Sequence, residues 1–204
     1  MTEAFDPGEA LGMIEDEESR VRRALAVNLP VQLLAWGVAW LVGFLALWLD
    51  VRAHSSYTPP GTLSSLVFFA LLLVAGVVTA IATTRATRGV GGRTARTGAR
   101  LGLGWGVGYG GFVLVAGGVA VYGTPEAASV MMTAGAVLIA GLMYLLSGAV
   151  WDDPLLVRLG VGIIAVGGVA SWTGPVWAPL VAGVAGGGGL LVAAGLAVAR
   201  RRRA

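Results

Sequence analysis

Clusters of arginine separated by long uncharged runs are the feature that most constrains this chain. Its 14 lysine and arginine residues are all arginines. Five stretches between or beside the clusters contain no charged residue: Leu29–Leu49, Leu63–Thr84, Leu101–Pro125, Ala127–Val150 and Leu159–Ala199. A helix needs about 20 predominantly apolar residues to cross the hydrocarbon core of a bilayer. The sequence therefore predicts an integral membrane protein.

The last uncharged stretch is 41 residues long and contains Gly174-Pro175, which predicts two spans joined by a tight turn. We therefore expect an all-α membrane protein whose transmembrane domain covers residues 24–199. An amphipathic segment, 1–23, precedes this domain and a basic tail, 200–204, follows it. The six predicted transmembrane helices span about 24–49, 62–84, 101–122, 127–150, 154–173 and 177–199.

The distribution of arginine predicts the orientation of these helices. If six helices alternate, 13 arginines lie on one side of the membrane and Arg52 lies alone on the other. Arginine accumulates in cytoplasmic loops. We therefore expect both termini in the cytoplasm, in a multi-pass protein of the bacterial cytoplasmic (inner) membrane.

The first 23 residues differ in character from the rest. They open acidic, whereas a signal peptide opens with a basic region, so we do not expect a cleaved leader. Leu11, Ile14, Val21 and Leu25 recur at helical spacing, and acidic residues precede arginines by four positions. We expect a cytoplasmic helix here that offers a surface to a protein partner.

The odd-numbered spans resemble one another. The third span begins Arg100-Leu-Gly-Leu-Gly104 and the fifth begins Arg158-Leu-Gly-Val-Gly162. These matches predict three helical hairpins in the same orientation, related by an axis along the membrane normal.

The first span carries the most organised face. Polar and then aromatic side chains recur there at every fourth position: Asn28, Gln32, Trp36, Trp40 and Phe44. Residues four apart share one face of a helix. This face is either an aromatic-lined pocket for an amphipathic or cationic molecule or a helix-packing surface, and we favour packing.

Glycine is abundant, with 33 residues in all. Gly102, Gly106 and Gly110 have the four-residue spacing that lets two helix backbones approach closely. We therefore expect Gly106 to face another helix. The consecutive glycines Gly186–Gly189 predict either a hinge or tight packing, and packing is favoured.

The loop between the second and third spans is basic and contains no acid. Its arginines are predicted to contact either the headgroups of anionic lipids or the acidic N-terminal segment: Arg85, Arg88, Arg93, Arg96 and Arg100. A homo-oligomer is a further assembly that the sequence allows. The pI near 9.9 is explained by this juxtamembrane charge, so we expect no nucleic-acid partner.

The chain offers little material for chemistry. It has no cysteine, and its one histidine, His54, lies in a predicted outer loop. No charged residue lies deep in any predicted span. Asp152-Asp153-Pro154 predicts a helix N-cap followed by proline in the first turn. We therefore expect no catalytic residue, no cofactor and no metal site.

The charged N-terminal segment followed by Ala35-Trp-Gly-Val-Ala-Trp40 resembles small uncharacterised bacterial six-helix membrane proteins. The three-hairpin layout also resembles the HdeD-type acid-resistance membrane proteins. This resemblance implies an inner-membrane protein with a stress-related or unknown role, and it carries over no catalytic residue.

These observations favour a non-enzymatic membrane protein with a structural, stress-related or regulatory role. The alternative is a small permease or exporter for an amphipathic or uncharged solute, which would use the aromatic face of the first span. A dry, glycine-packed centre would favour the first hypothesis, whereas a polar or aromatic central cavity would favour the second.

The predicted orientation is testable with reporter fusions. We expect a reporter fused at Ala204 to report the cytoplasm and one inserted at Thr58 to report the periplasm, because arginine is retained on the cytoplasmic side. A periplasmic signal from the Ala204 fusion would contradict the six-helix topology.

Overall fold

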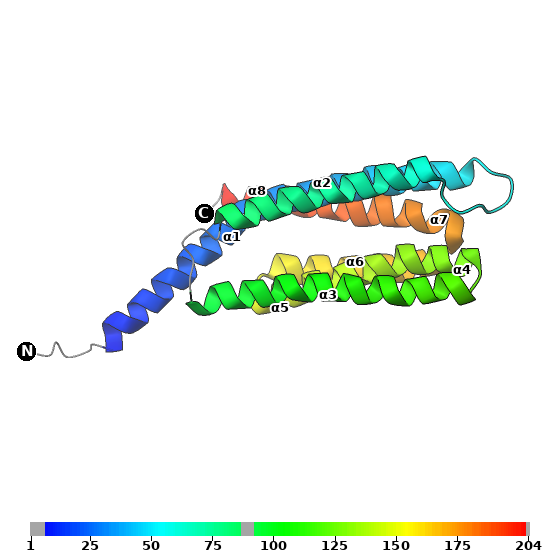
Figure 1. Ribbon diagram of the computed structural model, residues 1–204. Helices are drawn as coiled ribbons and strands as arrows, with labels where there is room; N and C mark the ends of the chain where they lie inside the picture. Colours follow the sequence, from blue (N-terminus) through cyan, green and yellow to red (C-terminus); the bar gives the residue numbers. More distant parts are fainter. Residues whose placement is uncertain (1–6, 87–91, 203–204) are drawn as a thin grey trace, which may run out of the picture.

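The computed structural model describes residues 7–86 and 92–202, and Figure 1 shows their arrangement. Side chains are described for residue 12 and for 28–85 and 95–202. Six helices in this part of the chain are long and apolar enough to cross a membrane, which indicates a multi-pass membrane protein. They cover Asn28–Arg52, Thr62–Arg85, Ala95–Tyr122, Pro125–Trp151, Pro154–Trp172 and Gly174–Arg201.

The first three spans belong to unbroken helices, α1 (Pro7–Arg52), α2 (Thr62–Ala86) and α3 (Gly92–Tyr122). The fourth span consists of α4 (Pro125–Val130), the π-helical turn η1 (Met131–Gly135) and α5 (Ala136–Trp151). The fifth is α6 (Pro154–Trp172). The sixth consists of α7 (Gly174–Val181), the π-helical turn η2 (Ala182–Gly187) and α8 (Gly188–Arg201).

Helix α1 continues far beyond its membrane span. Its residues 7–27 form one helix with the span and extend away from the bundle (Figure 1). At 1.5 Å per residue this extension is about 30 Å long. The boundary that we expected at residue 24 is therefore not a break in the helix.

The ends of the helices follow local rules that the sequence displays. The Asp153 carboxylate accepts a hydrogen bond from the backbone N–H of Leu155 at 2.8 Å, with Pro154 in the first turn of α6. This confirms the predicted cap. At the start of α7, Gly174 has a φ of +76°, a left-handed conformation that suits a residue without a Cβ.

The six spans form two layers of three (Figure 1). One layer contains α1, α2 and the α7–η2–α8 span, and the other contains α3, the α4–η1–α5 span and α6. The most extensive packing within the layers is α1 on α2, α1 on η2 and α8, and α5 on α6. The α5–α6 pair joins the second and third predicted hairpins, so packing does not follow the hairpins alone.

A shared hydrophobic core lies between the layers. Trp40 and Phe44 of α1, Leu190 of α8, Val137 of α5 and Ile163 of α6 belong to it, and each is at least 95% buried. Both layers therefore contribute large apolar side chains to one continuous centre.

Glycines bring the backbones together within each layer. A Cβ on Gly187 would lie 2.7 Å from the backbone nitrogen of Leu41, and one on Gly37 would lie 2.8 Å from the Leu191 side chain. In the other layer, a Cβ on Gly141 would lie 2.7 Å from the Ile164 nitrogen. Gly186 and Gly187 thus pack against α1 in the η2 turn, as favoured over a hinge for this run of glycines.

The structure corrects the prediction for the third span. A Cβ added to Gly102, Gly106 or Gly110 would have nothing within 4 Å except its own helix backbone and chain neighbours, so these glycines do not pack closely against another helix of the described chain. The reason is that α3 turns a different face to its neighbours. Phe112 and Ala116 are its buried residues, and they lie off the Gly102–Gly110 row.

Two matched substitutions test this assignment. Gly160→Ala should lower the free energy of unfolding by about 1–3 kcal/mol because its Cβ would lie 2.7 Å from Leu145 Cα and overpack the α5–α6 interface. Gly106→Ala should leave stability unchanged or raise it, since its Cβ meets open space. Unfolding temperatures in detergent give the comparison, and equal losses in both variants would contradict the assignment.

Candidate functional site

The face of α1 singled out by the sequence divides between two environments. The part nearer the N-terminus faces α2. The Gln32 Nε2 donates a hydrogen bond to Thr83 Oγ1 at 3.2 Å, and the Trp36 indole N–H donates to Thr79 Oγ1 at 2.9 Å. Asn28, one turn earlier, is half-buried. Polar groups that would be costly in lipid are therefore used to join α1 to α2.

The part of this face that contains Trp40 and Phe44 lies in the centre of the bundle. Trp40 is 5% exposed and Phe44 is 3% exposed. The two rings meet edge to face with centroids 5.8 Å apart. The Phe44 ring also packs on the Phe68 ring of α2, with centroids 4.8 Å apart. A Cβ on Gly186 would lie 3.1 Å from the Trp40 ring. These aromatic side chains are almost fully buried and fill space between the helices.

A second aromatic group joins α3 to α5, and the sequence analysis did not single it out. Trp105 stacks with Tyr109 at 6.0 Å and meets Tyr144 edge to face at 5.4 Å. The Tyr109 hydroxyl donates to the Ala136 carbonyl at 3.0 Å. The four-residue spacing of Trp105 and Tyr109 was the signal available, but their partner Tyr144 lies in another span.

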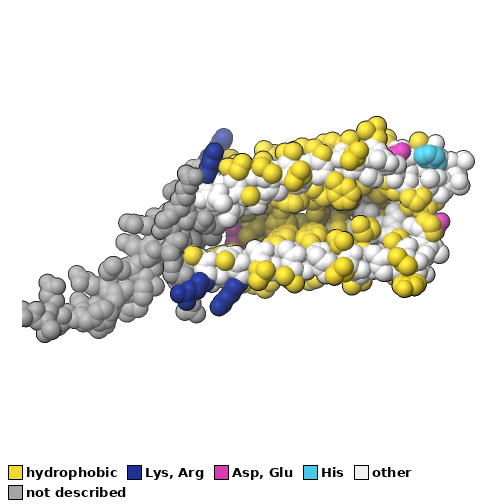
Figure 2. Space-filling model, in the orientation of Figure 1, with side chains coloured by type: hydrophobic (Ala, Val, Ile, Leu, Met, Phe, Trp, Pro, Cys, Tyr) yellow, Lys and Arg dark blue, Asp and Glu magenta, His cyan; other side chains and the backbone are white. Residues whose placement is uncertain are grey.

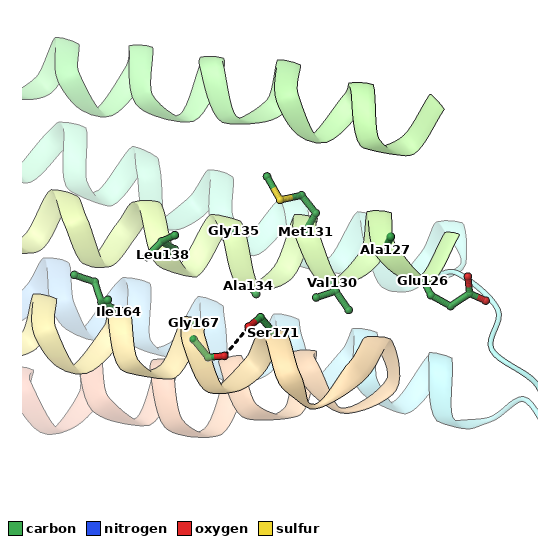
Figure 3. Close-up of a pocket in the computed structure, with 11 residues that line it drawn as sticks. Glu126, Ala127, Val130, Met131, Ala134, Gly135, Leu138, Ile164, Gly167 and Ser171 are labelled. Atoms are coloured by element: carbon green, nitrogen blue, oxygen red, sulfur yellow. Dashed lines mark hydrogen bonds between the residues drawn. The ribbon is translucent and has the colours of Figure 1, made fainter. Parts of the chain in front are cut away.

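An apolar groove of about 630 Å³ opens along the layer of α3, α5 and α6 (Figure 3). It lies between the α4–η1–α5 span and α6, and its lining includes small residues such as Ala134, Gly135 and Gly167. Glu126 lies at one end of the groove, and the Ser171 hydroxyl on its wall donates to the Gly168 carbonyl at 2.6 Å. The groove offers apolar surface rather than a set of groups arranged for bond making.

The groove borders a π-helical turn. Met131, Ala134 and Gly135 belong to η1, where the fourth span departs from regular α-helical geometry. Such turns occur frequently at functional sites. A Cβ on Gly135 would lie 2.5 Å from the Phe112 ring, so this turn also brings α3 against the fourth span.

The loop end opposite the termini carries an organised cluster. The Arg52 guanidinium lies over the rings of Trp48 and Trp177, 5.0 and 5.8 Å from their centroids. Asp50 caps the start of α2 by accepting hydrogen bonds from the Gly61 N–H and the Ser64 hydroxyl, both at 2.6 Å. These contacts fasten α1 to α2 and α7 and account for the two charged residues at this end of α1.

The predicted lipid-contacting arginines are placed in part. Arg85 ends α2, and Arg96 and Arg100 lie in the first turns of α3, all three with exposed side chains. Arg88 lies outside the described residues. Arg93 lies in α3, but its side chain is outside the described part. Within the described residues, no group of three His, Cys, Asp or Glu side chains could hold a metal ion.

No family model, no curated protein and no solved structure matches this chain. What the chain does must therefore be inferred from its own residues and their packing.

Proposed function

We propose that this protein is a non-enzymatic component of the bacterial cytoplasmic membrane, with both termini in the cytoplasm and a structural, stress-related or regulatory role. The observation that carries this proposal is the packed centre of the bundle. Trp40 and Phe44, the residues best suited to line a transport cavity, are buried against glycines and aliphatic side chains from both layers.

The charge distribution supports the same proposal. In the described spans, acidic and basic side chains lie near the helix ends, as Asp50, Glu126 and Asp153 do. Proton and ion paths through membranes use ionisable residues inside the spans. The polar contacts within the spans, such as Trp36 with Thr79, join helices to one another. These features favour a stably packed membrane protein without a solute pathway over a permease.

The long α1 suggests how such a membrane protein could act on other molecules. Residues 7–27 continue the first span as one helix, so a force or a bound partner on the cytoplasmic extension acts directly on α1. We propose that this extension binds a cytoplasmic protein. We also propose that the chain consists of three repeated helical hairpins and forms a homo-oligomer. The stress-related role is proposed from the resemblance to the HdeD-type proteins.

Truncation of Trp40 distinguishes this proposal from the permease alternative. Trp40→Ala should lower the free energy of unfolding by about 3–5 kcal/mol, because the removed indole fills the shared core. Trp172→Ala is the matched control, since Trp172 is 92% exposed and its removal should change stability little. Thermal unfolding in detergent measures both variants.

The alternative predicts the reverse. A Trp40→Ala protein that unfolds like the wild type but no longer retains a co-purifying small molecule would show that Trp40 contacts a solute. That result would overturn the proposal in favour of a permease or exporter.

A further inference from the structure

The groove between the fourth span and α6 occupies only one half of the membrane-spanning length. On the fourth span it runs from Glu126, in the first turn of α4, to Leu138. On α6 it runs from Ser171 to Ile164. Leu138 and Ile164 lie near the middle of their spans. At 1.5 Å per residue, the stretch from Glu126 to Leu138 is about 18 Å long. This length is close to one leaflet, because the whole hydrocarbon core is about 30 Å thick.

The groove has apolar walls and opens to the surface of the bundle. Ile164, Gly168 and Ser171 lie on one face of α6 and form one wall, where Gly168 and Ser171 are exposed. The Ser171 hydroxyl donates to the Gly168 carbonyl, so its proton is already engaged. The two helices meet at the floor, where a Cβ on Gly167 would lie 3.2 Å from the Ala134 carbonyl oxygen. The surface of the groove therefore suits a hydrocarbon chain.

The end of the groove at Glu126 is acidic. Glu126 is the one charged residue among the described residues that line it, and its side chain is exposed. In the described part of the chain, no basic side chain forms an ion pair with it. Figure 2 shows acidic side chains at this end of the bundle, opposite the termini, whereas the arginines visible in that view lie at the other end. A positively charged group therefore fits this end of the groove better than an anion does.

We propose that this groove binds an acyl chain of a membrane phospholipid with a primary ammonium headgroup, such as phosphatidylethanolamine, whose ammonium lies at Glu126. A primary ammonium has N–H donors, and hydrogen bonds between ionised groups are stronger than neutral ones. The pairing of a long apolar surface with one polar group at its end is typical of sites that fix the orientation of a ligand. The site requires only that the helices span a bilayer, so it does not depend on the function proposed above.

The length of the groove favours a lipid chain over a helix from a second copy of this protein. A transmembrane helix of a second copy would cross both leaflets, whereas the groove ends at Leu138 and Ile164, halfway along its two spans. An acyl chain belongs to one leaflet and ends near the middle of the bilayer. Its headgroup then lies at the level of Glu126, where α4 begins.

Native mass spectrometry of the full-length protein in a neutral detergent tests the headgroup assignment. The protein is titrated with dioleoylphosphatidylethanolamine and, in parallel, with dioleoylphosphatidylglycerol, and the affinity for the first bound lipid is measured. We expect the ammonium lipid to bind about two- to fivefold more tightly, the effect of one exposed ion pair. Glu126→Gln should remove this preference. Asp152→Asn is the control, because Asp152 is exposed and its left-handed φ of 51° also suits Asn.

Two further variants test the place of the acyl chain. Gly168→Leu adds a side chain to the wall of the groove and should weaken binding of the first lipid of either kind by about tenfold, through overpacking. Gly162→Leu makes the same change on α6 outside the groove and should bind lipid like the wild type. Both positions have open space around a Cβ, so both variants should fold.

Three results would each overturn the site. The first is equal affinity of the wild type for the two lipids, and the second is equal binding by the Gly168→Leu and Gly162→Leu variants. The third is a wild-type dimer that Gly168→Leu dissociates, which would assign the groove to a second copy of the chain.

Discussion

Close approach of helix backbones at glycine is the interaction on which the rest of this structure depends. Lipid is as apolar as the side chains that face it, so burial of apolar surface does not drive helices together in a membrane. Dispersion contacts and hydrogen bonds must do so, and both require short distances. Gly187 against Leu41 in one layer, and Gly141 against Ile164 in the other, provide these distances. The large core residues then fill the space between the two paired layers.

Polar contacts also hold the helices together, in addition to the close packing at glycines. Helix α2 has few buried residues, but Thr79 and Thr83 accept hydrogen bonds from Trp36 and Gln32 of α1. Helix α3 is attached to its layer in a comparable way, through aromatic contacts and the Tyr109 hydroxyl. These two peripheral helices are each fastened to one neighbour. Within residues 7–86 and 92–202, neither of them packs extensively on a second span.

Much of the architecture could be predicted from the sequence because it follows from local properties. Uncharged runs of the required length identify the six spans, and Asp153-Pro154 identifies the start of α6. The paired glycines could not be predicted in this way. Gly102 and Gly160 hold matching places in the repeated segments of the third and fifth spans, but only Gly160 meets another backbone closely. The difference depends on how each helix is rotated about its axis, which is decided by side chains on other spans.

The α1 face shows the same limit. Its four-residue spacing predicted one continuous surface. Instead, Gln32 and Trp36 form hydrogen bonds with α2, whereas Trp40 and Phe44 lie in the core of the bundle. A helix repeats every 3.6 residues, so residues at fourfold spacing drift around the axis and meet different neighbours. The sequence could therefore favour helix packing over a pocket for this face. It could not identify the helix that each of these residues contacts.

Water access to the middle of the bundle tests the packed centre most directly. The chain contains no cysteine, so a single Val137→Cys variant places one thiol in the core at a position that is 0% exposed. Ser55→Cys, in the exposed loop before α2, is the positive control. A dry centre predicts that a charged, water-soluble methanethiosulfonate reagent labels Ser55→Cys and leaves Val137→Cys unlabelled in the folded protein. Rapid labelling of Val137→Cys would reveal a water-filled pathway and contradict the packed centre.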